Sequence, residues 1–304
     1  MKKLAVVGSV NMDMVARVDR FPQPGETRTG DSFQVAPGGK GANQAVALGR
    51  LGADVWMAGM VGDDASGEMY LKNFREMGVG VGALGIAAGE TTGTAVIEVE
   101  RGGENHIIIV PGANALCDLE WLQVTLPKLM DRDIFLFQLE IPQRTVFQAM
   151  RILKEAGKTV ILDPAPARKL PDEVFGYVDY ITPNETELMA IADGGSMEAR
   201  MRALRQKGVG AVIAKCGADG AYVLSAEGFG HAKGFKVRPV DTTAAGDTFN
   251  AGLAYGLAAG MGILAAARFG NAAAAISVTA PGAQGGMPTR EMVEKFMKEC
   301  ENRA

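Results

Sequence analysis

The segment of this sequence best equipped for chemistry is a turn of small residues that opens a helical pattern. Residues 241–250 read DTTAAGDTFN. The small side chains of Ala244, Ala245 and Gly246 leave the first amide groups of the helix uncovered, so the turn can form an anion hole at the positive end of the helix dipole. Asp247 stands inside this turn. It is either a simple partner of the dipole or the proton acceptor for a hydroxyl nucleophile in phosphoryl transfer.

A second candidate is the glycine-rich turn at residues 37–44, PGGKGANQ, which leads directly into a helical pattern. Its glycines, among them Gly39, allow close backbone approach, and Lys40 beside a helix start favours an oxygen-rich or anionic ligand. The turn is not a Walker loop, because Lys40 is followed by Gly41 and not by Ser or Thr. A plain strand-to-helix turn would require neither Lys40 nor Asn43, and we therefore interpret both as functional.

The third candidate is the pair Asn11 and Asp13, which follows an apolar run at residues 4–10. Residues two apart share one face of an extended chain, so we expect an amide and a carboxylate side by side at the carboxyl end of the first strand. Open α/β sheets bind ligands at that edge. The pair alone is weak evidence, because Asn and Asp at strand ends are more often turn formers.

Composition excludes several classes of function. The 304 residues carry 31 Lys and Arg against 35 Asp and Glu, a net charge of −4 that argues against nucleic acid as a partner. Two histidines and three widely spaced cysteines offer neither a zinc site nor a disulfide framework, so we expect a carboxylate base and a reducing cytoplasm. The alanine-rich residues 246–279 include Asp247, Arg268 and polar residues, and we expect soluble helices there and no membrane span.

Short β-branched runs alternate with helical patterns along most of the chain, which is typical of a mostly parallel sheet covered by helices. We expect a single α/β domain over residues 1–304. The predicted strands are 4–10, 55–61, 134–139, 159–162, 180–182 and 211–216. The predicted helices are 41–51, 67–77, 144–156, 185–191, 198–207, 247–259, 263–278 and a closing amphipathic helix at 289–300.

Two segments depart from this alternation. Residues 94–100 and 106–110 are strand-like and flank Arg101-Gly102-Gly103, which predicts a β-hairpin. Residues 21–36 are rich in Pro, Gly and Thr and lack a helical period. We expect segments 11–36 and 92–111 to form a small sheet, either a lid over a site or an exposed edge that pairs with a partner.

The two long motifs, two hundred residues apart, resemble the two signatures of the ribokinase-like, phosphofructokinase-B-type sugar kinases. Further stretches resemble the same family: Gln138-Leu139-Glu140, Asp163-Pro164-Ala165-Pro166-Ala167, Thr182-Pro183-Asn184-Glu185-Thr186-Glu187 and Pro281-Gly282-Ala283-Gln284. The resemblance covers essentially the whole chain. It implies a three-layer α/β fold with a β-sheet lid, an ATP-dependent kinase acting on a primary hydroxyl of a sugar, D-ribose first, and a homodimer formed through the lid.

Carried over residue by residue, the resemblance implies Asp247 as catalytic base and the Ala244–Gly246 turn as the phosphate site. It implies sugar contacts from Asn11, Asp13, Gly39, Lys40, Asn43 and Glu140. Asn184 and Glu187 match a motif that places phosphate and hydrated Mg²⁺, and Gly217, Gly220 and Asn271 fall where the nucleotide binds. A K⁺ site is implied at Asp241, Thr243, Ser277, Ala280, Gly282 and Gly286.

Two departures from the family pattern leave the substrate open. Lys215 stands where Thr is frequent, beside the nucleotide phosphates, and Ala280-Pro281 replaces a more basic pair near the cation loop. The alternative substrates are 2-keto-3-deoxygluconate, fructose and a nucleoside. A non-catalytic sugar sensor is a further alternative, which the intact Asp247 disfavours. A nicotinamide-dependent oxidoreductase is disfavoured by the absence of a G-x-G-x-x-G fingerprint.

Overall fold

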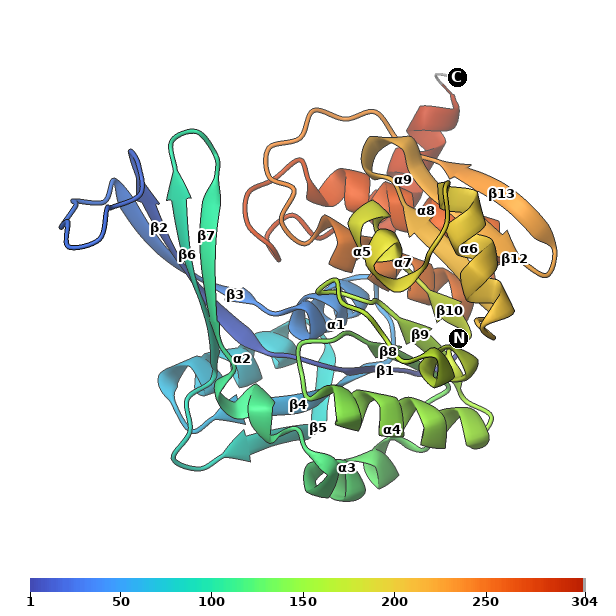
Figure 1. Cartoon of the computed structure of the whole chain (residues 1–304), viewed down its shortest axis with the longest axis horizontal. Helices are drawn as coiled ribbons and strands as arrows, with labels where there is room; N and C mark the ends of the chain where they lie inside the picture. The colour runs from blue at the N-terminus through green and yellow to red at the C-terminus, as the bar shows by residue number, and fades with distance from the viewer. Residues whose placement is uncertain (303–304) are drawn as a thin grey trace.

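A computed structural model of the chain describes residues 1–302 and contains a nine-stranded central sheet (Figure 1). Its strand order is β13-β12-β11-β10-β9-β8-β1-β4-β5. The strands pair in parallel from β5 to β11, and β12 and β13 add antiparallel at one edge. Their bounds are β1 Leu4–Val7, β4 Val55–Gly62, β5 Val79–Ala87, β8 Ile134–Phe137, β9 Thr159–Leu162, β10 Tyr180–Ile181, β11 Ala211–Lys215, β12 Gly220–Ser225 and β13 Gly228–Lys233.

Helices cover both faces of this sheet, which confirms the predicted three-layer α/β fold. One layer contains α1 Lys40–Arg50, α2 Ala65–Glu76, α7 Ala245–Ala258, α8 Ile263–Ser277 and α9 Arg290–Glu301, and the other α3 Leu119–Thr125, α4 Gln143–Glu155, α5 Glu185–Ile191 and α6 Met197–Gln206. Strand β1 shows why two layers are needed. Ala5 and Val7 pack into one core cluster and Leu4 and Val6 into the other, because successive side chains of a strand point to opposite faces.

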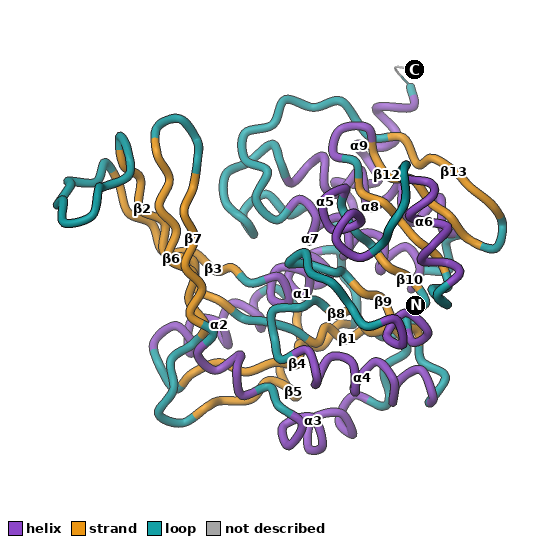
Figure 2. The backbone as a smooth tube through the Cα atoms, viewed as in Figure 1, coloured by secondary structure: helices purple, strands orange, loops and turns teal. Residues whose placement is uncertain are grey.

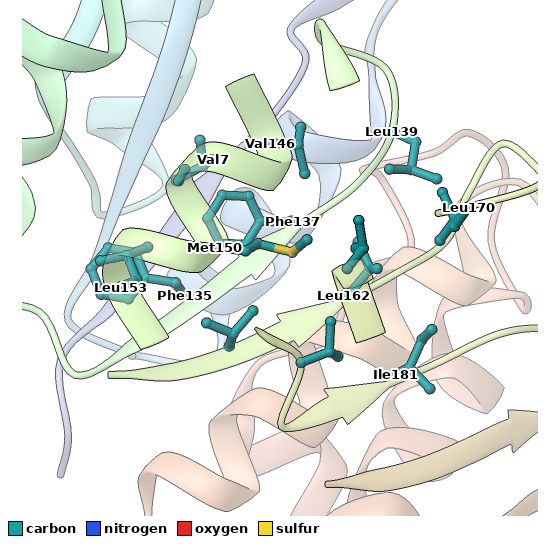
Figure 3. Packing of buried hydrophobic residues seen from close by; sticks show 14 of the residues in the cluster. Val7, Phe135, Phe137, Leu139, Val146, Met150, Leu153, Leu162, Leu170 and Ile181 are labelled. Atoms are coloured by element: carbon teal, nitrogen blue, oxygen red, sulfur yellow. The ribbon is translucent and has the colours of Figure 1, made fainter. Parts of the chain in front are cut away.

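Buried apolar strands at the centre of the sheet hold the fold together. Figure 3 shows Val146, Met150 and Leu153 of α4 packed over Phe135 and Phe137 of β8. All of these side chains are fully buried. Because each such side chain contributes about 1.5–3 kcal/mol on removal from water, the centre of the sheet is a rigid platform for whatever its strand ends carry.

A second, four-stranded sheet projects from this platform (Figures 1 and 2). It consists of β2 Asn11–Val18, β3 Ser32–Gly38, β6 Gly93–Glu100 and β7 Asn105–Val110, in the order β3-β2-β6-β7. We call it the lid sheet. Strand β7 is exposed at every residue, including Ile107, Ile108 and Ile109. The antiparallel pairing of β6 with β7 agrees with the predicted hairpin.

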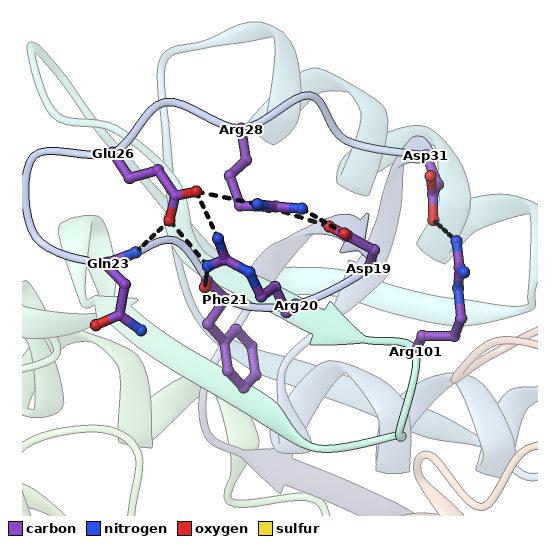
Figure 4. A network of polar contacts seen from close by, with 8 residues as sticks. All are labelled: Asp19, Arg20, Phe21, Gln23, Glu26, Arg28, Asp31 and Arg101. Carbon is purple, nitrogen blue, oxygen red and sulfur yellow. Dashed lines mark hydrogen bonds and ion pairs between the residues drawn. The ribbon is translucent and has the colours of Figure 1, made fainter.

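The far end of the lid sheet is tied together by ion pairs (Figure 4). Glu26 accepts hydrogen bonds from Arg20 and Arg28, and Arg28 also pairs with Asp19. Arg101, in the β6–β7 turn, reaches Asp31 at 3.5 Å. Exposed pairs of this kind each contribute little, about 0–1 kcal/mol. The pairs among Asp19, Arg20, Glu26 and Arg28 tie the loop between β2 and β3 to itself, and the Arg101–Asp31 pair joins that loop to the hairpin.

The prediction for the first strand was wrong in one respect. Strand β1 ends at Val7, and Asn11 and Asp13 belong to β2, which pairs with β3 and β6 of the lid sheet and not with the central sheet. The two residues therefore stand where the lid sheet joins the body. The apolar run at residues 4–10 did not reveal that the strand ends at Val7, because a buried strand and the buried segment after it accept the same residues.

The sequence patterns also failed to predict β5, β12 and β13, which are rich in glycine. Glycine normally weakens a strand, but in β5 it makes room for a ring. A Cβ on Gly80 would lie 2.3 Å from Cδ1 of Trp56, and one on Gly82 would lie 2.7 Å from Cζ3 of the same ring. Gly80 and Gly82 of β5 are therefore required by the packing of Trp56 on the neighbouring strand.

Within residues 1–302, no helix is both long enough and apolar enough to cross a membrane. The cysteines Cys117, Cys216 and Cys300 are all free thiols.

Candidate active site

A cavity of about 770 Å³ opens at the carboxyl ends of the central strands. It is bounded by the start of α7, by α8, and by the loops after β9 and β11. Phe235, Val237 and Val278 supply an apolar part, and charged groups gather at the other end. The predicted site residues that line this cavity are Lys40, Asn184, Glu187, Lys215, Gly217, Gly220, Ala244, Ala245, Gly246, Asp247 and Asn271.

The start of α7 provides the expected anion hole. Ala244 caps the helix in the left-handed region, with φ of 58°, and it is the one residue other than glycine with positive φ among residues 1–302. Such a conformation costs about 1–3 kcal/mol and occurs mainly at functional sites. Within the same residues, no hydrogen bond occupies the N–H groups of Gly246 and Asp247. Two backbone donors are thus available for an anion.

Asp247 is buried at the floor of the cavity and accepts one hydrogen bond on each carboxylate oxygen. Asn43 Nδ2 donates to Oδ2 and Gln44 Nε2 donates to Oδ1, both at 3.1 Å. Burial raises the pKa of Asp247 to about 6, and the charge of Asp163 adds to the rise while that of Lys40 opposes it. A carboxylate with this pKa is ionised at neutral pH and is a stronger base than an exposed aspartate.

Two lysines face this carboxylate from different elements. Lys215, at the end of β11, lies with Nζ 2.9 Å from Asp163 Oδ1 and 3.9 Å from Glu187 Oε2. A Cβ on Gly246 would lie 3.5 Å from the Lys215 Nζ. The ammonium group is therefore close to the start of α7, where the free amides are. Burial lowers the pKa of Lys40, but the charges of Asp247, Asp163 and Glu140 outweigh it and raise that pKa above its ordinary value.

Asn184 and Glu187 form a capping box at the start of α5. Asn184 accepts from the Glu187 N–H, and Glu187 accepts from the Asn184 N–H and side-chain amide. Both residues line the cavity beside Asp163. Among residues 1–302, no three His, Cys, Asp or Glu side chains gather as a metal site. Glu187, with Asp163 beside it, offers carboxylate oxygens of the kind that bind a hard cation with a shell mostly of water and phosphate.

The predicted sugar-binding residues meet where β2, α1 and the loop after β8 converge. Asn11 is held by Asn114, whose Nδ2 donates to Asn11 Oδ1 at 2.7 Å. Burial, followed by the charges of Glu140 and Asp247, raises the pKa of Asp13 to about 6. Glu140 accepts from the Lys40 N–H at 3.1 Å. The result is a group of carboxylates and amides next to Asp247.

Gly39 is the N-cap of α1, and its φ of 84° lies in the region that favours glycine. A Cβ on Gly39 would lie 2.7 Å from the Asn11 backbone nitrogen. Substitution would therefore push apart the two segments that carry Asn11 and Lys40.

The predicted cation residues lie on two loops joined by Asp241. Its Oδ1 accepts from the Thr243 N–H and its Oδ2 from the Gly282 N–H, each at 2.9 Å. Burial works in the opposite direction, but these hydrogen bonds hold the pKa of Asp241 below its ordinary value. The Ala280 N–H donates to the Ser277 carbonyl at 3.4 Å. A Cβ on Gly286 would lie 2.2 Å from that carbonyl oxygen. A retained negative charge and close-packed carbonyls suit a monovalent cation.

The predicted nucleotide residues line the wide part of the cavity. Gly217 and Gly220 bound the turn between β11 and β12 with φ of 52° and 103°. A Cβ on Gly220 would meet the Ala232 carbonyl oxygen at 2.3 Å. Asn271 of α8 donates Nδ2 to that same carbonyl at 2.7 Å. These three residues therefore belong to one wall of the cavity, in which Gly220 must lack a side chain because the Ala232 carbonyl is close.

Sequence reasoning missed several polar residues of the site. Gln44, Gln138, Asp163 and Gln284 all hydrogen-bond to the residues described above, and Asn114 fixes Asn11. Four of the five lie in motifs that were singled out, and Asn114 lies outside them. A buried amide or carboxylate requires a hydrogen-bond partner, so the sequence could have predicted that these residues form a network. It could not have shown which residue bonds to which.

Comparisons with known proteins identify the family of the whole chain. The model of the pfkB family carbohydrate kinases matches residues 1–290. The chain is 41% identical to a ribokinase of Haemophilus influenzae, over 98% of this chain and 99% of that protein. A ribokinase structure from Thermotoga maritima is 39% identical and superposes with a TM-score of 0.91, covering 98% of this chain and 100% of the other. A structure of Arabidopsis thaliana ribokinase complexed with ribose and ATP is 32% identical, with a TM-score of 0.89 and coverage of 98% and 99%.

Proposed function

The chain belongs to the pfkB family of carbohydrate kinases, and on that premise we propose that it transfers the γ-phosphoryl group of ATP to the 5-hydroxyl of D-ribose. Full-length similarity to proteins named ribokinase supports the sugar, and the relative complexed with ribose and ATP supports the pair of ligands. The observation that carries the proposal is the position of Asp247, between the sugar-binding group of residues and the free amides of α7.

In this reaction the C5 hydroxyl gives its proton to Asp247 as its oxygen attacks the γ-phosphorus. The bond to the β-phosphate oxygen breaks and ADP leaves. The free N–H groups of Gly246 and Asp247, which follow the turn at Ala244, stabilise the negative charge of the transferring group together with Lys215. Gly217, Gly220 and Asn271 bound the space for the nucleotide, with Phe235 and Val237 as apolar surface.

We assign the sugar site to Asn11, Asp13, Gly39, Lys40, Asn43 and Glu140. Its side chains are amides, carboxylates and one ammonium, which suits a small polyol whose hydroxyls each find a partner. No aromatic ring is among the assigned residues, whereas a nucleoside base would require a stacking surface. A keto acid would require a cation at its carboxylate, and Lys40 is the one cation in this group.

Two ions complete the proposal. Asn184 and Glu187, with Asp163 beside them, would hold hydrated Mg²⁺, which neutralises phosphate charge when it is bound. Asp241 and Thr243, with the loop of Ser277, Ala280, Gly282 and Gly286, would hold K⁺ and so order the turn that precedes Ala244. Both sites have the oxygen donors that these ions prefer.

We further propose that the lid sheet closes over the sugar and pairs with the lid sheet of a second copy. Asp13 lies on one face of β2. Val35, Val96 and Ile108 lie in one row of the register on the opposite face and are all exposed. An apolar row of this kind on an open sheet is a surface for association. A homodimer would cover it, while the Asp13 face serves the sugar. The three free thiols support a reducing, cytoplasmic location.

A panel of acceptors tests the substrate directly: ribose, 2-deoxyribose, fructose, 2-keto-3-deoxygluconate and adenosine, each with ATP and Mg²⁺ under detection of ADP. We expect the highest kcat/KM for ribose. Loss of one hydroxyl contact should make 2-deoxyribose worse by about 1–3 kcal/mol. Asp13→Ala should raise the ribose KM strongly, because its carboxylate binds hydroxyls that do not react.

A higher kcat/KM for any of the other acceptors would show that ribose is not the preferred substrate. The assignment as a kinase would still stand. Lys215, which adds a second ammonium group at the phosphates, is the residue to exchange in that case. If no acceptor gave ADP above the rate without sugar, a non-catalytic sugar sensor would be the better interpretation.

A further inference from the structure

Two chains of side-chain amides, from four separate parts of the fold, end on the two carboxylate oxygens of Asp247. We propose that Asn73, Gln284, Gln44 and Gln138 are positioning residues, which fix the plane of the Asp247 carboxylate so that one lone pair points at the sugar hydroxyl. The inference rests on the proposed role of Asp247 as proton acceptor. None of these four residues is itself assigned to the sugar, the nucleotide or a metal.

The first chain starts on α2. Asn73 Nδ2 donates to Gln284 Oε1 at 2.9 Å, and Gln284 Nε2 donates to Asn43 Oδ1 at 3.1 Å. Asn43 Nδ2 then donates to Asp247 Oδ2 at 3.1 Å. Gln284 lies in the loop between α8 and α9, and Asn43 lies on α1. Residues 43, 73, 247 and 284 are thus joined through side chains alone.

The second chain starts at the end of β8. Gln138 Nε2 donates to Gln44 Oε1 at 2.6 Å. Gln44 Nε2 donates both to Asp247 Oδ1, at 3.1 Å, and to Asp163 Oδ2, at 3.0 Å. Gln44 and Gln138 are completely buried. One amide nitrogen therefore bridges two buried carboxylates.

The Asp247 carboxylate at the end of both chains fixes which group donates and which accepts in every hydrogen bond. An ionised carboxylate only accepts, so Asn43 and Gln44 must each turn an amide nitrogen toward Asp247. Their carbonyl oxygens then face Gln284 and Gln138, which must donate in turn, and Asn73 must donate to Gln284. No amide can flip without placing two acceptors face to face. A buried pair of that kind is costly.

The chains leave Asp247 with a defined reactive position. Each oxygen has one amide donor, and a carboxylate oxygen has a second lone-pair direction. The charged groups that face Asp247 are Lys40 at the start of α1, Lys215 at the end of β11, Asp163 after β9 and Asp13 on β2, with Glu140 beyond Lys40. None of them donates a hydrogen bond to Asp247. The amides alone therefore set its orientation.

Gln284→Met and Gln44→Met test the inference, because methionine keeps the length of the side chain and removes the amide. Asn43 is excluded because it belongs to the proposed sugar site. We expect each variant to lower kcat about ten- to hundredfold and to change the ribose KM much less, because the lost donor serves the reacting carboxylate. The acidic limb of the kcat profile should move up by about one pH unit, since lost hydrogen bonds to the ionised form raise the pKa.

Gln148→Met is the matched control. Gln148 lies on α4, in the opposite helix layer, and bonds Arg151 of its own helix. It should leave both kcat and the pH profile unchanged. Gln44→Met also controls for the cation loop, because Gln284 lies in that loop and Gln44 does not. The same pH shift in both variants would assign the effect to Asp247.

An unmoved acidic limb in both variants, with thermal unfolding midpoints near the parent value, would overturn the inference. If either variant unfolds early, Asn73→Leu takes its place. Asn73 is outside the buried centre, and its loss should give a smaller shift of the same sign. The role of Asp247 as base is tested independently of the amide residues. If Asp247→Asn kept turnover, that role would be wrong whatever the amide variants do. If Asp247→Asn lost turnover and the amide variants kept the parent profile, only the positioning role would be wrong.

Discussion

Strand β8 of the central sheet is buried at every residue, whereas β7 of the lid sheet is exposed at every residue, although each contains four consecutive large apolar side chains. The difference lies in what covers them. Helices α4 and α7 pack near β8 on opposite faces, and no helix covers β7 in residues 1–302. The body can therefore hold a reacting carboxylate rigidly. The lid sheet has little burial to resist movement or association.

The largest expected effect concerns Asp247, which lies in the helix-covered part of the molecule. Asp247→Asn keeps the shape and removes the proton acceptor, so kcat should fall by roughly 10²–10⁴ with little change in the sugar KM. Steady-state kinetics with ribose check this. Near-parental turnover would leave Asp247 as a helix-terminus carboxylate only.

A matched pair of truncations measures the difference in burial. Leu136→Ala in β8 should lower the free energy of unfolding by about 2–5 kcal/mol, because it opens a cavity in the core. Ile108→Ala in β7 removes a side chain that is 65% exposed and should cost the monomer less than about 0.5 kcal/mol. Urea unfolding of both variants provides the test. Equal losses would mean that the lid sheet is covered in solution as completely as the core.

One carboxylate from each region should contribute to the pH dependence of kcat/KM. Asp13 belongs to the lid sheet and Asp247 to the body, and burial raises the pKa of each to about 6. Both must be ionised to act, so activity is present above pH 6 and is lost as the pH falls. We expect kcat/KM to drop about a hundredfold between pH 7 and pH 5, with a limiting slope near two. Asp13→Asn should reduce that slope to one, and a slope of one in the parent would show that a single carboxylate matters.

The lid sheet is tested by association. Ile108→Lys places a charge in the exposed row with Val35 and Val96, and should weaken the proposed dimer about tenfold or more. Sedimentation at micromolar concentrations measures it, with Val124→Lys, an exposed substitution on α3, as control. A parent protein that sediments only as monomer would rule out the dimer.

The smallest effect concerns the loops that flank the anion hole. We expect K⁺ to raise kcat about fivefold or more over Na⁺ at fixed ionic strength, because a bound ion would order the turn before Ala244. Asp241→Asn should remove the preference. A rate that is the same in both salts would mean that the hydrogen bonds of Asp241 suffice to hold the loops.

Features of this molecule that depend on neighbouring residues in the chain could be predicted from its sequence. The alternation of apolar strands and amphipathic helices predicted the layered α/β fold, because periodicity is a property of neighbours along the chain. The small residues at 244–246 predicted an open helix start, and Asp247 was identified inside it. The glycines of the 37–44 turn indicated a close approach of the backbone, and Gly39 makes it. Each of these features depends on a few consecutive residues.

Only the tertiary structure decided which distant residues meet. Strand β2, which carries Asn11 and Asp13, pairs with β3 and with β6, and Asn11 lies opposite Gly93, 82 residues further along the chain. The amide chains join residues 73, 284, 43 and 247. The exposure of β7 likewise follows from the absence of a covering helix in the described residues. Hydrogen bonds and burial are satisfied in space, so a sequence states which groups need partners and the fold selects them.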